Sequence, residues 1–113
     1  MHKVIHQSDV ESLPVNMEGA SETRIQWLIH EPDGAENFYM RRFTINPGGH
    51  SPRHSHPYEH EIYILSGTGN ALVDGKWYEI SRDFVIFVPP DVEHQIKNTG
   101  AEPLVFLCLV PKT

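Results

Sequence analysis

Short apolar segments separated by turn residues run through most of the chain, and this alternation constrains its fold more than any other feature. The segments are rich in Ile, Val, Phe, Tyr and Trp, the side chains that favour strands. They are TRIQWLIH (23–30), ENFYMRRFTI (36–45), EHEIYILSG (59–67), GNALVDGKWYEI (69–80), DFVIFVP (83–89), EHQIKN (93–98) and EPLVFLCLVP (102–111). Many short strands at close intervals are typical of a sandwich or barrel, so the sequence predicts an all-β fold.

Two stretches of turn residues divide these segments. Asp74 and Gly75 lie between two strand-like runs, and the Asp-Gly pair suits the positive φ values of a tight two-residue hairpin turn. The stretch INPGGHSP (45–52) contains a proline and two glycines, which a central strand does not tolerate. The sequence therefore predicts a hairpin at the first position and a strand break at the second.

Length and charge narrow the organisation and the partners. The 113 residues fit one domain of roughly 100–150 residues, so we expect a single domain over 1–113. The net charge of −6, without a cluster of Lys and Arg, argues against nucleic acid and against an anionic membrane surface as partners. Cys108 is the single cysteine, and the N-terminal residues do not read as a secretory signal, so we expect a cytoplasmic protein.

Histidines gather just before one of the strand segments. His54, His56 and His60 fall within RHSHPYEHEIYILSG (53–67), and His94 opens another strand segment far downstream. Residues two apart in a strand share a face, so His54 and His56 are predicted to project side by side. Four imidazoles from three segments can meet only if the sheet closes on itself, as a small β-barrel does. The first three histidines alone fit an adventitious metal site as well as a true one.

The stretch around these histidines resembles the first motif of the cupin family, G-x5-H-x-H-x3–4-E-x6-G. GGHSPRHSHPYEHEIYILSG places Gly48, His54 and His56 in register with it. Where the family has glutamate, His60 and Glu61 compete. Six residues separate His60 from Gly67, as the x6 of the motif requires, so the resemblance favours His60.

A later stretch resembles the second cupin motif, G-x5-P-x-G-x2-H-x3-N. DFVIFVPPDVEHQIKN matches it at Pro89, His94 and Asn98, whereas Asp83 and Asp91 stand where the family has glycine. Aspartate tolerates a left-handed backbone better than most residues do, so both turns are expected to survive the change. The two motifs span 48–67 and 83–98, which leaves 1–20 as an N-terminal arm and first strand.

The resemblance is to the small single-domain cupins whose metal is held by four histidines, several of which are manganese proteins. It implies a double-stranded β-helix, the jelly-roll or cupin barrel, and commonly a homodimer. It also implies one divalent transition metal ion held by His54, His56, His60 and His94. Manganese is the first expectation and iron the second, while zinc, nickel and copper also fit imidazole ligands.

Four neutral imidazoles would leave the charge of a divalent ion uncompensated, so the ion should attract an anionic or enolisable oxygen ligand. Six-coordinate Mn(II) or Fe(II) would keep two positions open, whereas tetrahedral Zn(II) would be filled and structural. We therefore expect a dioxygenase-like enzyme that oxidises or cleaves a small oxygenated or unsaturated molecule, with the metal centre as its catalytic group. One alternative is a non-catalytic, metal-stabilised module that binds a small molecule. Another is a polar pocket without metal.

Overall fold

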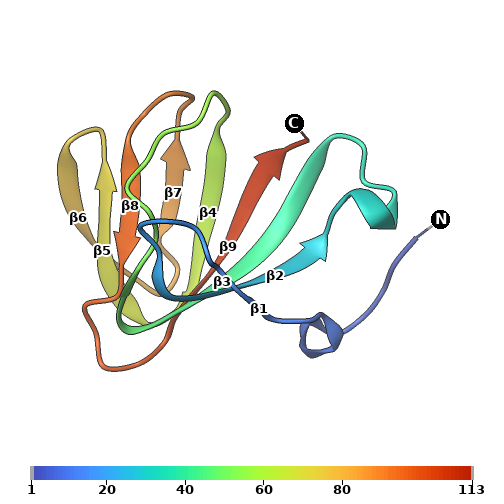
Figure 1. Cartoon of the computed structure of the whole chain (residues 1–113), viewed down its shortest axis with the longest axis horizontal. Coiled ribbons are helices and arrows are strands. Elements are labelled where there is room, and N and C mark those ends of the chain that lie inside the picture. The colour runs from blue at the N-terminus through green and yellow to red at the C-terminus, as the bar shows by residue number, and fades with distance from the viewer. Residues whose placement is uncertain (1, 113) are drawn as a thin grey trace.

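The computed structural model describes residues 2–112, which form nine strands and two short 3₁₀ helices (Figure 1). The predicted all-β class is confirmed. Within residues 2–112, no helix has the length and hydrophobicity that a membrane crossing requires. The strands are β1 (Leu13–Pro14), β2 (Ser21–Ile29), β3 (Phe38–His50), β4 (His60–Ser66), β5 (Thr68–Val73), β6 (Lys76–Ser81), β7 (Val85–Val88), β8 (His94–Lys97) and β9 (Leu104–Pro111), and the helices are η1 (Gln7–Asp9) and η2 (Glu31–Asp33).

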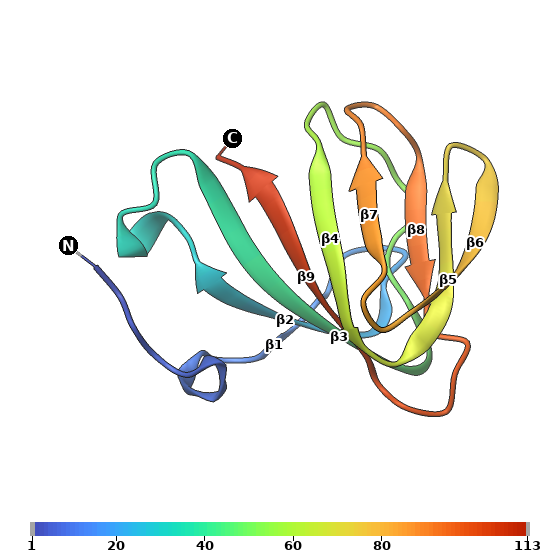
Figure 2. The same cartoon turned by 180° about the vertical axis from the view of Figure 1, so that it is seen from behind.

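The strands form one antiparallel sheet that curls around an interior. Its order is β6-β5-β8-β3-β9-β4-β7. In addition, β2 pairs with β3, and β1 pairs with β2. Strands that are distant in sequence are therefore neighbours, as the crossovers of a jelly roll require. Both views show β4, β7, β8, β5 and β6 standing around the interior, while β2 and β3 extend to one side with η2 beyond them (Figures 1 and 2).

The core lies inside this curl and consists mainly of aliphatic side chains, together with Phe106 and Cys108. The most deeply buried large side chains come from five different strands, so no pair of strands could bury them alone. They are Ile45, Ile64, Leu72, Val88 and Leu104.

The predicted break at 45–52 is wrong, because β3 runs through it to His50. Thr23 of β2 pairs with Ile45 and Ser21 pairs with His50, so 46–49 of β3 oppose a single residue of β2. This is a large β-bulge, and Gly48 takes a φ of 84° within it. The glycines therefore do not end the strand; they let it bend while it continues to pair.

The predicted hairpin at Asp74 and Gly75 is confirmed. Val73 of β5 pairs with Lys76 of β6, which leaves a two-residue turn. Its φ values are 51° at Asp74 and 79° at Gly75, as a turn with two left-handed residues requires.

The two aspartates that replace motif glycines also keep the glycine-like backbone. The φ angle is 71° at Asp83 and 65° at Asp91. The amide of Asp91 donates to the carbonyl oxygen of His56 at 2.6 Å, so this turn helps to position the histidine segment.

Replacing Asp91 with alanine is expected to lower the free energy of unfolding by about 1 kcal/mol, because alanine tolerates a left-handed backbone poorly. Asp91→Gly is expected to stay within about 0.5 kcal/mol of wild type, since glycine adopts this φ freely. Urea denaturation measures both variants. Equal losses for alanine and glycine would mean that the backbone angle does not constrain this position.

Candidate metal centre

Three histidines from two segments converge at one end of the interior. One ring nitrogen from each of His54, His56 and His94 lies within 4.8 Å of the others. The Nε2 atoms of His54 and His56 are 3.1 Å apart. His54 and His94 also form an isolated β-bridge, in which each amide donates to the other's carbonyl oxygen at 3.2 and 2.9 Å. The backbone thus joins the two motifs at the cluster.

His54 and His56 do not owe their proximity to a shared strand face, as the sequence predicted. Residues 51–59 form a loop, in which the single bridge at His54 is the only ladder contact among the described residues. The loop turns the two rings edge to face, with centroids 4.0 Å apart. The pairing was predicted correctly, whereas its structural cause was not.

His60 lies beside this cluster as the first residue of β4. Its ring centroid is 4.9 Å from that of His94 and 5.0 Å from that of His56, but it does not join the three-histidine group. Its Nδ1 is 3.2 Å from Cys108 Sγ. Its Nε2 is buried and has no hydrogen-bond partner among the described residues. Glu61, the competing motif residue, lies on the exposed face of β4.

Burial keeps the imidazoles of His54, His56 and His60 neutral, which suits their ring nitrogens to ligation. Burial, with the neighbouring histidines next in effect, lowers the pKa of His54 to about 4. Burial and then the Arg41 cation lower the pKa of His60 to about 3, and burial also lowers the pKa of His56. A neutral imidazole offers the lone pair that a metal ligand needs.

A hydrogen bond also sets the tautomer of His94. Its Nδ1 lies 2.9 Å from the carbonyl oxygen of Val92, and only a protonated Nδ1 can donate to a carbonyl. The Nε2 of His94 is then unprotonated and free to bind a cation. Ligating histidines commonly have this arrangement.

The donor set fits a divalent transition metal ion. Nitrogens that share one ion at ~2.0–2.1 Å lie about 3 Å apart, which matches the separation of the two facing Nε2 atoms of His54 and His56. The orphaned Nε2 of His60 points to the same conclusion, because a buried polar atom without a partner is costly.

The histidines line an interior cavity of about 140 Å³ whose walls are largely apolar. Tyr58 stacks on His56 with ring centroids 4.9 Å apart and an interplanar angle of 3°. The predicted N-terminal arm contributes Val15 and Met17 to the wall. The other lining residues are Thr23, Arg41, Phe43, Ser51, Pro52, His60, His94, Ile96, Phe106 and Cys108, together with the histidine pair.

Sequence reasoning missed Arg41, which is the one arginine or lysine among the described residues that line this cavity. Its Nη2 donates to Cys108 Sγ at 3.0 Å and lies 3.4 Å from His60 Nδ1. The signal was present in the alternation of β3, because Arg41 is in phase with Phe43 and the fully buried Ile45. One of the two adjacent arginines therefore had to share their face.

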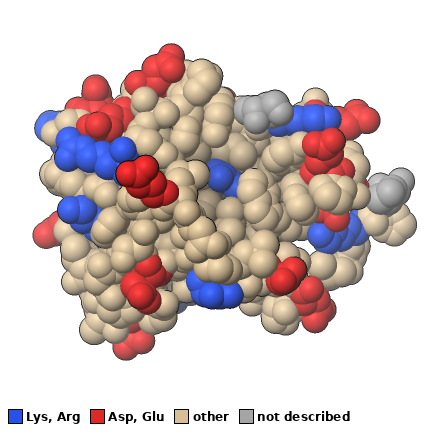
Figure 3. Space-filling view, in the orientation of Figure 1, with Lys and Arg blue, Asp and Glu red and all other residues tan. Residues whose placement is uncertain are grey.

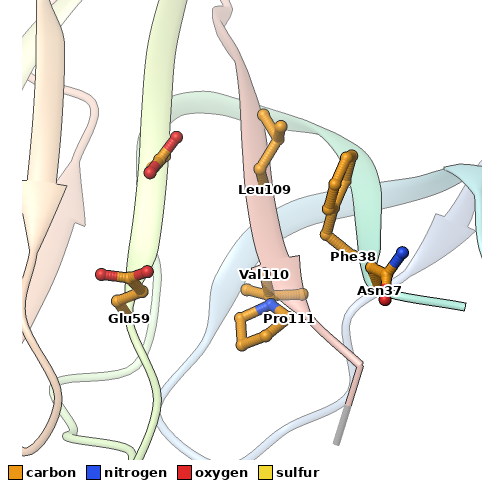
Figure 4. A pocket seen from close by; sticks show the side chains of 7 residues that line it. Asn37, Phe38, Glu59, Leu109, Val110 and Pro111 are labelled. Atoms are coloured by element: carbon orange, nitrogen blue, oxygen red, sulfur yellow. The ribbon is translucent and has the colours of Figure 1, made fainter.

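A second hollow lies away from the histidines, where the starts of β3 and β4 meet the end of β9 (Figure 4). Two carboxylates and the ring of Phe38 line it beside apolar residues of β9. No histidine or cysteine is among its lining residues within the described part of the chain. Its lining therefore offers carboxylate oxygens but none of the imidazole or thiolate donors found around the first cavity.

The sequence matches the family described as Cupin domain over residues 41–110. Mannose-1-phosphate guanylyltransferase from Escherichia coli is 39% identical over 72 residues, which are 62% of this chain and 15% of that enzyme. The chain spans less than half the length of the first curated relatives that it matches.

Two solved structures are similar over nearly the whole chain. The polyketide cyclase RemF from Streptomyces resistomycificus is 34% identical with a TM-score of 0.92, and the match covers 98% of this chain and 80% of that one. A predicted oxalate decarboxylase from Thermotoga maritima is 30% identical with a TM-score of 0.87, over 98% and 100% of the two chains. These likenesses confirm the predicted double-stranded β-helix.

Proposed function

Because this chain belongs to the cupin domain family, we propose that it is a metal-dependent enzyme acting on a small, oxygen-rich molecule with an enolisable carbonyl group. One observation carries the proposal: three histidines, with a fourth beside them, converge in a small, largely apolar cavity. A buried imidazole nitrogen without a hydrogen-bond partner, as Nε2 of His60 is among the described residues, is costly unless it binds an ion, so this arrangement favours a working metal centre over a polar pocket.

The proposed ligands are His54, His56 and His94, with His60 as the fourth. Two observations support the inclusion of His60. Its Nε2 is buried without a partner among the described residues, and its ring centroid lies 4.9 Å from that of His94. Manganese is the proposed ion and iron the next choice, because the resemblance to four-histidine cupins favours them.

Such an ion would act as a Lewis acid toward a substrate oxygen. The imidazoles add no negative charge to the centre, which favours binding of an anionic or enolised oxygen. Phe43, Phe106 and the stacked Tyr58 line the rest of the cavity and give it an aromatic wall. The volume of about 140 Å³ restricts the substrate to a small molecule or to one end of a larger one.

The names of the two similar structures agree with this substrate class. One is named a polyketide cyclase and the other a predicted oxalate decarboxylase, and polyketides and oxalate are both rich in carbonyl or carboxylate oxygens. The cyclase likeness favours a reaction without net oxidation. The dioxygenase-like reaction expected from the sequence stays a prediction, and the same probe can test it.

The test uses benzoylacetone, an aromatic 1,3-diketone, with protein of measured metal content. Accelerated keto–enol conversion, followed by ultraviolet absorption, is the expected result. Oxygen uptake with cleavage of the diketone would instead support the dioxygenase. Binding without either reaction would favour the non-catalytic module, and protein that binds no divalent ion would overturn the proposal.

Replacing His60 with alanine is expected to leave a folded barrel that binds Mn(II) more than roughly tenfold more weakly. Glu61→Ala is the matched control, because it changes the adjacent and exposed candidate from the motif. Calorimetric titration and circular dichroism check both variants. Loss of affinity in Glu61→Ala alone would transfer the ligand role to the carboxylate, whereas unfolding of His60→Ala would indicate a structural ion.

We also propose that the protein is a homodimer. The outer face of β4 and the edge strand β7 exposes 41% of Tyr63, 55% of Phe87 and 71% of Val85. Such an apolar sheet face suits a second copy of the chain. Light scattering after size exclusion should give twice the monomer mass for wild type and the monomer mass for Phe87→Asp. A monomeric wild type at micromolar concentration would contradict this.

A further inference from the structure

We propose that Arg41 binds the anionic group of the substrate, so that the substrate carries a carboxylate or a similar oxyanion next to an apolar part. This inference rests on the proposed function, because it concerns the same cavity. It adds the charge of the substrate and the residue that recognises it.

The alternation of β3 divides its two adjacent arginines between the two faces of the sheet. Arg41 lines the histidine cavity, whereas Arg42 lies on the opposite face, where its Nη1 donates to Gln26 at 2.9 Å. Arg42 faces the outer groove against the N-terminal arm. The two residues share a backbone and a charge but not a site, so each can serve as the control for the other.

The guanidinium of Arg41 has no anionic partner within residues 2–112. Its hydrogen bonds there come from Nη2, directed at Cys108 and His60, while Nε is buried without a partner. Its remaining contacts are aromatic, with the guanidinium carbon 5.1 Å from the ring centroid of Phe43 and 5.7 Å from that of Trp27. Stacking orients the planar group but leaves its charge unpaired.

The cavity wall contains no acidic residue among the side chains that line it in the described part of the chain. Figure 3 shows one recessed basic group near the centre of the drawn face, with uncharged residues directly around it. A shielded cation that lacks a counter-ion is costly, and an anion that enters the cavity removes this cost.

The chemistry of arginine specifies the class of anion. The flat guanidinium suits the two oxygens of a carboxylate, and charge-assisted hydrogen bonds of this kind are among the strongest in proteins. Phe43, Tyr58 and Phe106 form an aromatic wall beside Arg41. Benzoate, a carboxylate attached to a flat apolar ring, is therefore a suitable probe, and benzamide is its neutral counterpart of the same shape.

The experiment measures the binding of benzoate and benzamide to the metal-loaded full chain by calorimetry. Wild type is expected to prefer benzoate, and Arg41→Gln is expected to lose at least roughly tenfold in benzoate affinity while its benzamide affinity stays similar. Arg42→Gln, the matched control, is expected to behave as wild type. Metal content and circular dichroism are measured on every variant.

A second readout follows the Nε–H resonance of Arg41 in zinc-loaded wild type by NMR spectroscopy. This resonance should shift with benzoate and not with benzamide.

Equal benzoate affinity in wild type and Arg41→Gln would overturn the inference, because the anion would then bind elsewhere, such as on the metal. An Nε–H resonance that does not respond to benzoate would overturn it as well, even if Arg41→Gln fails to fold. Both results are independent of whether benzoylacetone reacts. Failure of the proposed enzymatic function and failure of the Arg41 assignment are thus distinguishable.

Discussion

Replacing His94 with alanine is expected to lower the affinity for Mn(II) by more than roughly 100-fold, because loss of a ligand exceeds the 10–100-fold cost of losing an outer hydrogen-bond partner. His94 is central to the cluster: its ring lies 4.9 Å from both His54 and His60, and its backbone pairs with His54. Its tautomer is set by the carbonyl of Val92. Elemental analysis after dialysis, followed by calorimetric titration with Mn(II), measures the loss.

His50→Ala is the control for this variant. His50 ends β3, and its Nδ1 lies 3.1 Å from the carbonyl oxygen of Ser51, away from the cavity lining. We expect its Mn(II) affinity to match that of wild type. Equal losses in the two variants would mean that histidine content, and not the converging cluster, accounts for metal binding.

Replacing Gly67 with alanine is expected to lower the free energy of unfolding by about 4 kcal/mol, a loss of the size seen for the most damaging single substitutions. Gly67 joins β4 to β5 with a φ of 88°, a conformation that alanine rarely adopts. A Cβ there would also collide with the backbone oxygen of Pro103 and would lie 2.8 Å from Leu104 Cα. Because both obstacles are backbone atoms, the clash cannot be relieved by a side-chain rotation.

Gly34→Ala separates the two causes. Gly34 has nearly the same φ, 91°, but a Cβ there would meet nothing within 4 Å. Only the conformational cost applies, so we expect a loss of about 1 kcal/mol. Urea denaturation of both variants gives the comparison. Similar losses for the two glycines would show that backbone angle alone, without the close approach of the loop before β9, limits position 67.

The strands of the fold could be read from the sequence because strand preference is local. Each predicted segment from 23 to 111 contains or overlaps an observed strand, and the Asp-Gly turn had the predicted form. The strand break predicted at 45–52 was wrong, because local rules treat glycine and proline as the end of a strand. Whether a strand ends or bulges depends on the neighbouring strand, here β2, which continues to pair beyond the bulge.

The sequence alone was enough to identify which residues could bind a metal, since imidazole is a ligand in any fold, and it placed His94 correctly at the start of a strand. Tertiary structure decided which of them meet. His54, His56 and His94 converge through a loop and a single backbone bridge, which no local pattern encodes. Tertiary structure also brought Arg41 beside Cys108, 67 residues away in the chain, because β3 and β9 pair across a jelly-roll crossover. Local preference specifies a strand, but only the closure of the sheet specifies which side chains its inward face meets.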